Sequence, residues 1–226
     1  MSILAISSAC ATATSDHDRE AAESADAGGG APAADAAVFE PADAMPAHND
    51  PPDAGAVEPP CTDQTVNLLN NANFDNGLGA WAQTSSGGYQ LIMNQSDTGI
   101  SAHTGVMMAW LSGYDDAVDS IGQNAPLPAD ARNAIVKGQR HFQTDEGSGV
   151  YDRTWLEITD PQGNVLEELA TWTNQDTSGD WVAFEYGLAG NYQGQTIKVR
   201  LRSDTDYSNP SWFFYDTLRL EVTTCQ

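Results

Sequence analysis

The residues of this chain that could do binding chemistry lie on one face of a predicted strand. In the segment 133–143, alternate residues share a face because successive side chains of a strand point to opposite sides. One face carries polar and charged side chains, namely Lys137, Gln139, His141 and Gln143. On the following strand Leu156 and Ile158 are expected in the core, which leaves Trp155 on the face of His141. An aromatic plane beside amide and charged donors suits a sugar, whose CH face stacks while its hydroxyls hydrogen-bond.

The other tryptophans leave two interpretations open. Trp172 and Trp212 are further candidates for exposed aromatic platforms, whereas Trp110 and Trp181 are expected in the core. The alternative is that Trp155, Trp172 and Trp212 all pack under loops and contact no ligand.

Catalytic patterns are missing from the sequence. His17 and His48 precede the folded region, which leaves His103 and His141 within it. We expect His103 to be structural, bonding the adjacent backbone. There is no HExxH, no GxSxG and no phosphate-cradling glycine loop before a helix. The sequence therefore predicts a protein that is not an enzyme, and a small secreted hydrolase remains the weakest of three alternatives.

The charge of the chain narrows its partners. The 226 residues include 9 Lys and Arg against 32 Asp and Glu, a formal net charge of −23. Such a surface repels phosphate backbones, so we expect no nucleic acid partner. It suits divalent cations and solubility outside the cell. No apolar run is long enough to span a bilayer, so any membrane contact should be through a lipid.

The first residues resemble the end of a bacterial lipoprotein signal peptide. A short apolar run leads into Ser8-Ala9-Cys10, and in that family the signal is cleaved before the cysteine, which is then acylated. The run is shorter than a working signal, so residues 1–10 are expected to be its truncated end. The resemblance implies an extracytoplasmic protein anchored by Cys10 to the outer membrane or cell surface. The alternative is a cytoplasmic protein with an incidental cysteine.

Residues 11–60 have the composition of a linker. They are rich in Ala, Asp, Glu, Pro and Gly, and large apolar side chains are isolated. Too little apolar surface is available to offset the entropy of ordering, so the segment is predicted to be a disordered acidic spacer.

From Cys61 onward the composition changes to short runs of β-branched and aromatic residues separated by turn clusters. We predict strands near 65–69, 80–85, 89–94, 104–111, 118–125, 133–143, 153–160, 164–173, 181–187, 196–203 and 212–223. This spacing indicates an all-β fold, an antiparallel sandwich or jelly roll of nine to eleven strands over residues 61–226. Terminal strands of a sandwich commonly lie adjacent, so Cys61 and Cys225 are predicted to form a disulfide, the alternative being two free thiols.

The same region resembles jelly-roll accessory modules related to carbohydrate-binding modules and MAM domains, which accompany secreted bacterial peptidases and glycosidases. The match covers nearly all of 61–226. It is carried in order by Asn67-Leu68-Leu69-Asn70, Phe74-Asp75-Asn76-Gly77, Trp81, His103-Thr104-Gly105, Ala109-Trp110-Leu111-Ser112-Gly113-Tyr114-Asp115 and Phe213-Phe214-Tyr215-Asp216-Thr217-Leu218.

The resemblance also implies candidate calcium ligands. In such modules the acid after the opening Phe and the one in the last strand share a structural Ca²⁺; here these are Asp75 and Asp216. A second acidic set lies in turns that the resemblance brings together, namely Asp145, Glu146, Asp152 and Asp206. Oxygen ligands suit this hard cation. The alternative is that these acids bind no metal and are solvated or hydrogen-bonded at strand ends and turns.

Together these observations predict a non-catalytic, membrane-tethered binding module whose ligand is carbohydrate or an envelope protein. The alternative from another class is a structural or adhesive envelope lipoprotein that mediates protein contacts.

Overall fold

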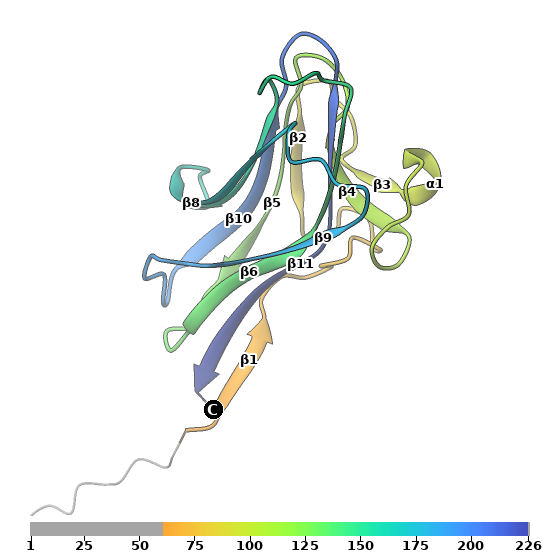
Figure 1. The fold of residues 1–226 in the computed structure, drawn as a ribbon. Coiled ribbons are helices and arrows are strands. Elements are labelled where there is room, and N and C mark those ends of the chain that lie inside the picture. The colour runs from red at the N-terminus through yellow and green to blue at the C-terminus, as the bar shows by residue number, and fades with distance from the viewer. Residues whose placement is uncertain (1–60, 226) are drawn as a thin grey trace, which may run out of the picture. The chain divides into compact units, whose positions relative to one another are not determined.

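The domain is a sandwich of two antiparallel sheets (Figure 1). The computed structural model describes residues 61–225. In chain order the elements are β1 (Asp63–Asn67), β2 (Ala82–Ser85), β3 (Ile92–Asn94), α1 (Gln95–Thr98), β4 (Met107–Ser112), β5 (Val118–Pro126), β6 (Arg132–Thr144), β7 (Arg153–Thr159), β8 (Val165–Thr173), β9 (Val182–Gly187), β10 (Thr196–Asp204) and β11 (Ser211–Cys225). The strands lie close to the predicted positions, and the predicted fold class is confirmed.

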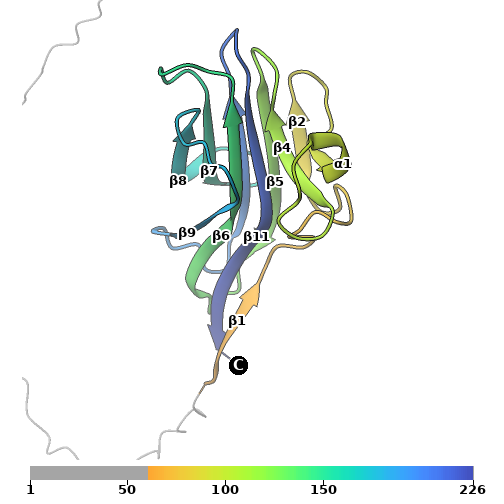
Figure 2. The ribbon, with the colours of Figure 1, turned by 45° about the vertical axis from the view of Figure 1, so that its right-hand side comes forward.

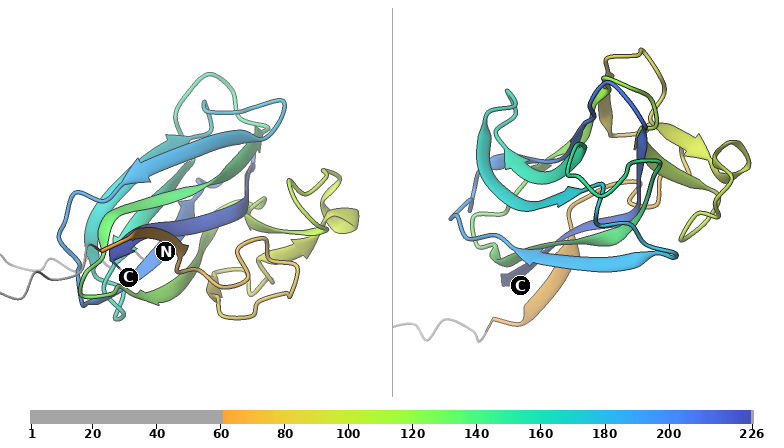
Figure 3. Two further views of the ribbon diagram at one scale, coloured as in Figure 1. Left: turned by 90° about the horizontal axis from the view of Figure 1, so that it is seen from below. Right: turned by 45° about the horizontal axis from the view of Figure 1, so that its top comes forward.

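The two sheets share the strands almost evenly. Sheet A has the order β3-β4-β11-β6-β9, with β1 also paired to β11, and sheet B has the order β2-β5-β10-β7-β8. The long strands β6 and β11 run side by side through sheet A (Figure 2). Two further views show the sheets as separate layers (Figure 3). Consecutive strands β6 and β7 lie in different sheets, which decides where their outward side chains point.

Aromatic rings fill the space between the layers. Phe142 lies 5.1 Å from Phe213 and 5.4 Å from Tyr215, measured between ring centroids. The buried Tyr215 hydroxyl pairs with Thr154 Oγ1 at 2.7 Å, so its polar end is satisfied. Trp172 belongs to this core, with 6% of its surface exposed and its ring 5.4 Å from Phe184. The prediction of Trp172 as an exposed ligand platform is therefore wrong, because its strand turns this side chain inward.

A small residue in β6 makes room for these rings. A Cβ added to Gly138 would lie 2.6 Å from atoms of both Phe184 and Leu218. Two residues later the Arg140 guanidinium stacks over Phe142 at 4.9 Å and donates to the Asp176 carbonyl at 2.8 Å. This inward face of β6 is thus closed by a cation–π contact at the edge of the core.

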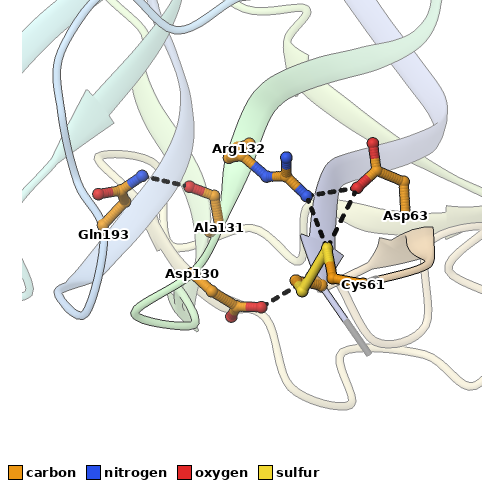
Figure 4. A network of polar contacts seen from close by, with 7 residues as sticks. Cys61, Asp63, Asp130, Ala131, Arg132 and Gln193 are labelled. Carbon is orange, nitrogen blue, oxygen red and sulfur yellow. Dashed lines mark hydrogen bonds and ion pairs between the residues drawn. A yellow bond between two sulfur atoms is a disulfide. The ribbon is translucent and has the colours of Figure 1, made fainter. Parts of the chain in front are cut away.

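The first and last strands are joined covalently. Cys61 and Cys225 form a disulfide with a Cα–Cα distance of 5.3 Å, which confirms the predicted pairing. Antiparallel pairing of β1 with β11 brings the two ends together, with Asp63 opposite Cys225. Around the disulfide, Arg132 pairs with the Asp63 carboxylate and the Cys225 N–H donates to Asp130 Oδ2 at 2.7 Å (Figure 4).

Some predictions fall elsewhere in the chain. The lipid on Cys10, the signal segment 1–10 and the linker 11–60 lie outside the described residues. Within the described part, no helix has the length and apolar character needed to cross a bilayer.

Candidate functional site

The buried carboxylate of Asp216 and the exposed carboxylate of Asp75 fix the loop that precedes β4, here called the 99–106 loop. The Thr104 N–H donates to Asp216 Oδ2 at 2.8 Å, and the Val106 N–H donates to Asp75 Oδ1 at 2.8 Å. Between these bonds lies Gly105, with φ of +66°, where an added Cβ would come within 1.9 Å of Asp75 Oδ2. Asp75 and Asp216 therefore hold the backbone on both sides of Gly105.

Asp75 and Asp216, which were predicted to share a calcium ion, therefore anchor this loop through hydrogen bonds. Asp216 is fully buried, and burial raises its pKa to about 6, although the Thr104 and Thr217 N–H groups favour the charged form. His103 Nδ1 lies 2.9 Å from Thr217 Oγ1, so this histidine also ties the loop to β11, through a side chain rather than the adjacent backbone. Calcium binding by Asp75 and Asp216 stays a prediction.

A row of rings crosses the outer face of sheet A. Phe214 on β11 lies between its cross-strand partners Trp110 on β4 and His141 on β6, with centroid distances of 5.5 and 6.1 Å. Trp181, directly before β9, continues the row 5.7 Å from His141. The row spans four adjacent strands, or about 14 Å.

The structure contradicts the predicted burial of two of these residues. Trp110 and Trp181 were expected in the core but are partly exposed on the outer face. On β4 the neighbours Ala109 and Leu111 are the fully buried residues that face inward. Strand alternation therefore places Trp110 outward, and that signal was present in the sequence.

Beside Trp181 the 99–106 loop encloses a groove of about 650 Å³, here called the Trp181 groove. Trp181 Nε1 donates to the Ser101 carbonyl at 2.9 Å, which fixes the indole ring. The ring of His103 stands 6.0 Å from the indole, roughly edge-on. The remaining walls are formed mainly by His141, Gln143 and Asp180. An aromatic plane thus stands among several polar side chains.

His141 is the most unusual polar group in this groove. Its side chain is largely buried, and Nδ1 has no hydrogen-bond partner within residues 61–225. Its Nε2 lies 3.2 Å from Gln143 Nε2. Burial lowers the pKa of His141, so the imidazole is neutral at pH 7 and can both donate and accept. The predicted partner Gln139 shares this outer face but lies in a neighbouring hollow beside Lys137 and Glu185, outside the Trp181 groove.

Trp155 lies on the other side of the molecule. Leu156 and Ile158 are fully buried as predicted, but β7 belongs to sheet B, so Trp155 faces outward from that sheet. The expectation that Trp155 shares a face with His141 is therefore wrong. The Arg202 guanidinium covers Trp155 at 3.7 Å from the ring centroid. The largely buried Glu157 binds the Arg200 Nε at 2.7 Å.

An acidic cluster forms where the β6–β7 and β10–β11 connections meet. Carboxylate oxygens of Glu146, Asp152 and Asp206 lie within 4.8 Å of one another, so this group could hold a metal ion. Asp152 is fully buried and accepts hydrogen bonds from the Asp206 N–H and the Ser211 hydroxyl. Glu146 Oε1 is buried and has no partner among the described residues. The fourth predicted acid, Asp145, is exposed and outside the group.

Electrostatics within the cluster favour a proton or a cation. Burial, followed by the charges of Asp206 and Asp152, raises the pKa of Glu146. Burial also raises the pKa of Asp152, although the Ser211 hydroxyl and the Asp206 N–H oppose this shift. Three carboxylates this close repel one another unless a positive charge lies between them.

No protein-family model matches the chain, and no curated protein matches it in sequence. Among solved structures, the chain is similar to the carbohydrate-binding module TmCBM61 in complex with beta-1,4-galactotriose, with 21% identity, TM-score 0.47, and coverage of 69% of this chain and 97% of that one. A family 16 carbohydrate-binding module gives 19% identity, TM-score 0.44, and coverage of 68% and 99%. The K3 cleaved adhesin domain of Lys-gingipain from Porphyromonas gingivalis w83 gives 14% identity and a TM-score of 0.46, with coverage of 70% of this chain and 99% of that one. At these scores the ligand must be argued from the residues of this chain.

Proposed function

We propose that this domain is a non-catalytic module that binds carbohydrate in the Trp181 groove. The observation that carries the proposal is the fixed indole of Trp181 beside His141, whose Nδ1 has no partner in the described structure. A sugar ring stacks its CH face on an indole, while its hydroxyls accept hydrogen bonds from imidazole and amide N–H groups and donate to carboxylate oxygens. Trp181, His141, Gln143 and Asp180 supply that combination.

The net charge of the chain and the size of the groove define the class of sugar. A net charge of −23 disfavours a polyanionic glycan, so the ligand is a neutral polysaccharide or oligosaccharide. A volume of about 650 Å³ lies within the range of small-molecule sites.

The test is retention of the full chain on a panel of insoluble neutral polysaccharides. At least one should retain the parent protein, and Trp181→Ala should abolish retention without lowering the melting temperature by more than a few degrees. Trp155→Ala on the opposite sheet is the matched control and should bind normally. Failure of every polysaccharide to retain the parent would remove the proposal, and would favour the alternative of an envelope protein that mediates protein contacts.

We also propose that the module is exported and held at a membrane by a lipid on Cys10, with residues 11–60 as the spacer. The disulfide between Cys61 and Cys225 supports an oxidising compartment. Metabolic labelling with a fatty-acid analogue in a bacterial host tests the anchor. The label should be incorporated by the parent and by Cys61→Ser but not by Cys10→Ser; equal labelling of both variants would contradict the assignment.

For the acidic cluster we propose a structural Ca²⁺, because three carboxylates converge and Glu146 Oε1 has no partner in the described structure. At a hundred times its dissociation constant a ligand of the folded state adds about 2.7 kcal/mol. For a domain of this size that raises the melting temperature by roughly 5–11 °C over EDTA-treated protein. Glu146→Gln should abolish this rise in melting temperature, whereas Asp145→Asn should keep it. An unchanged rise in Glu146→Gln would show that the cluster is not the calcium site.

A further inference from the structure

A second cavity lies at the other end of the ring row, here called the Trp110 pocket. It has a volume of about 310 Å³, half that of the Trp181 groove, and lies between the β2–β3 and β4–β5 connections. Its walls are mainly aromatic and apolar, formed by Tyr89, Leu91, Met93, Trp110, Gly113 and Tyr114. Phe214, with 1% of its surface exposed, separates it from the Trp181 groove, so the two cavities open independently.

One wall of the pocket is held rigidly. The Tyr114 hydroxyl accepts from the Gly87 N–H at 2.9 Å and donates to Asp119 Oδ1 at 2.7 Å. It also lies 3.0 Å from Ser85 Oγ. These contacts fix the phenol ring, which stands edge-on to the ring of Tyr89 at 5.0 Å. Tyr89 is 59% exposed and forms the outer wall.

A hydrogen-bond donor at this wall has no acceptor. Trp110 Nε1 is buried and unpaired within the described part of the chain. It abuts Gly113, where an added Cβ would come within 2.9 Å of this nitrogen and 2.7 Å of Trp212 Cδ1. Gly113, with φ of +93°, therefore lies against the indole nitrogen and leaves no room for a side chain. A buried N–H without an acceptor is costly, and a ligand oxygen would satisfy it once a small shift of Gly113 exposed the nitrogen.

The pocket also shows which charge its occupant carries. Asp119 is the one charged side chain that lines it, and both carboxylate oxygens are engaged, by the Tyr114 hydroxyl and by the Ser112 N–H at 2.8 Å. An anion would meet this carboxylate, and the two hydrogen bonds that it accepts hold its oxygens in place. The occupant is therefore not an anion, is flat on at least one face and carries an oxygen acceptor.

We propose that the Trp110 pocket is a second carbohydrate site, which takes one neutral sugar ring at a chain end or branch. The ring stacks on Tyr89 and Tyr114, and one of its oxygens accepts from Trp110 Nε1. The inference rests on the proposed carbohydrate function but concerns a separate cavity. Trp212, a candidate from the sequence, supports the wall behind Gly113.

The test uses the indole N–H resonances of the ¹⁵N-labelled full chain, which has six tryptophans. Trp110→Phe and Trp181→Phe assign one resonance each. Titration with neutral methyl hexosides should shift the Trp110 resonance saturably with at least one sugar. Tyr89→Ala removes an exposed wall without disturbing the core, and should weaken this response about five- to tenfold. Tyr207→Ala, 77% exposed and outside both cavities, is the matched control and should respond normally.

Two results would overturn the inference: no sugar in the panel shifts the Trp110 resonance, or the shift survives Tyr89→Ala unchanged. The outcome is separable from that of the Trp181 groove. Polysaccharide binding that depends on Trp181, with a silent Trp110 resonance, leaves the proposed function standing and removes the second site. A shift of the Trp110 resonance without retention on any polysaccharide supports the Trp110 pocket and removes the proposed function of the Trp181 groove.

Discussion

The disulfide between Cys61 and Cys225 should set most of the resistance of this domain to unfolding. It closes a loop with a sequence separation of 164, and in the chain-entropy model such a loop is worth about 5 kcal/mol at 25 °C. The strand it secures contributes little else, because β1 pairs only with β11 and most of its side chains are exposed. The double variant Cys61→Ser, Cys225→Ser should therefore lose close to that full amount, lowering the melting temperature by roughly 10–20 °C.

Urea unfolding measures this loss directly. The midpoint should fall, and the slope of free energy against urea should rise because the uncrosslinked unfolded chain exposes more surface. The control is Asp63→Asn, which removes the exposed ion pair to Arg132 but keeps the disulfide, and should cost under about 1 kcal/mol. If the double variant also lost less than about 1 kcal/mol, the loop-closure reasoning would be wrong.

Three further substitutions and one control test other parts of the structure. Because the pKa of Asp216 is raised to about 6, the folded state holds this proton more tightly, so stability should fall by at most about 3 kcal/mol as pH rises from 4 to 6. Urea unfolding in EDTA should show this slope in the parent and a weaker one in Asp216→Asn. Trp172→Ala should lower the unfolding free energy by about 3–5 kcal/mol in the same assay. Gly105→Ala, whose Cβ would strike Asp75, should cost about 1–3 kcal/mol, whereas Gly147→Ala meets nothing within 4 Å and should be neutral on thermal melting.

The fold was predictable because its signals are local. Alternation in β6 and the turn clusters between strands place each strand within a few residues, and the two cysteines mark the ends that β1 and β11 bring together. What local pattern does not contain is the sheet to which each strand belongs. Trp155 was assigned to the face of His141 because β7 follows β6 in sequence, yet the chain crosses to the other sheet between them.

The candidate site was predictable only in part for the same reason. His141 was found from alternation along its own strand, whereas the Trp181 groove depends on the 99–106 loop, fixed by residues from distant parts of the chain. The acidic cluster shows the opposite case. Glu146, Asp152 and Asp206 were grouped from resemblance, and the structure brings these three together while Asp145 points elsewhere.

The two ends of β11 lie at opposite ends of the sandwich, one beside the loops and one at the disulfide. β11 begins at Ser211, beside the loops that hold the acidic cluster, and ends at Cys225, beside Cys61. The 15 residues of this strand place its two ends roughly 45 Å apart. Both cavities lie in the half of the sandwich nearer the loops, since the Trp110 pocket is lined from the β4–β5 connection and the Trp181 groove by residues just before β9. Both cavities therefore lie toward the end of the sandwich opposite the disulfide that joins β1 to β11.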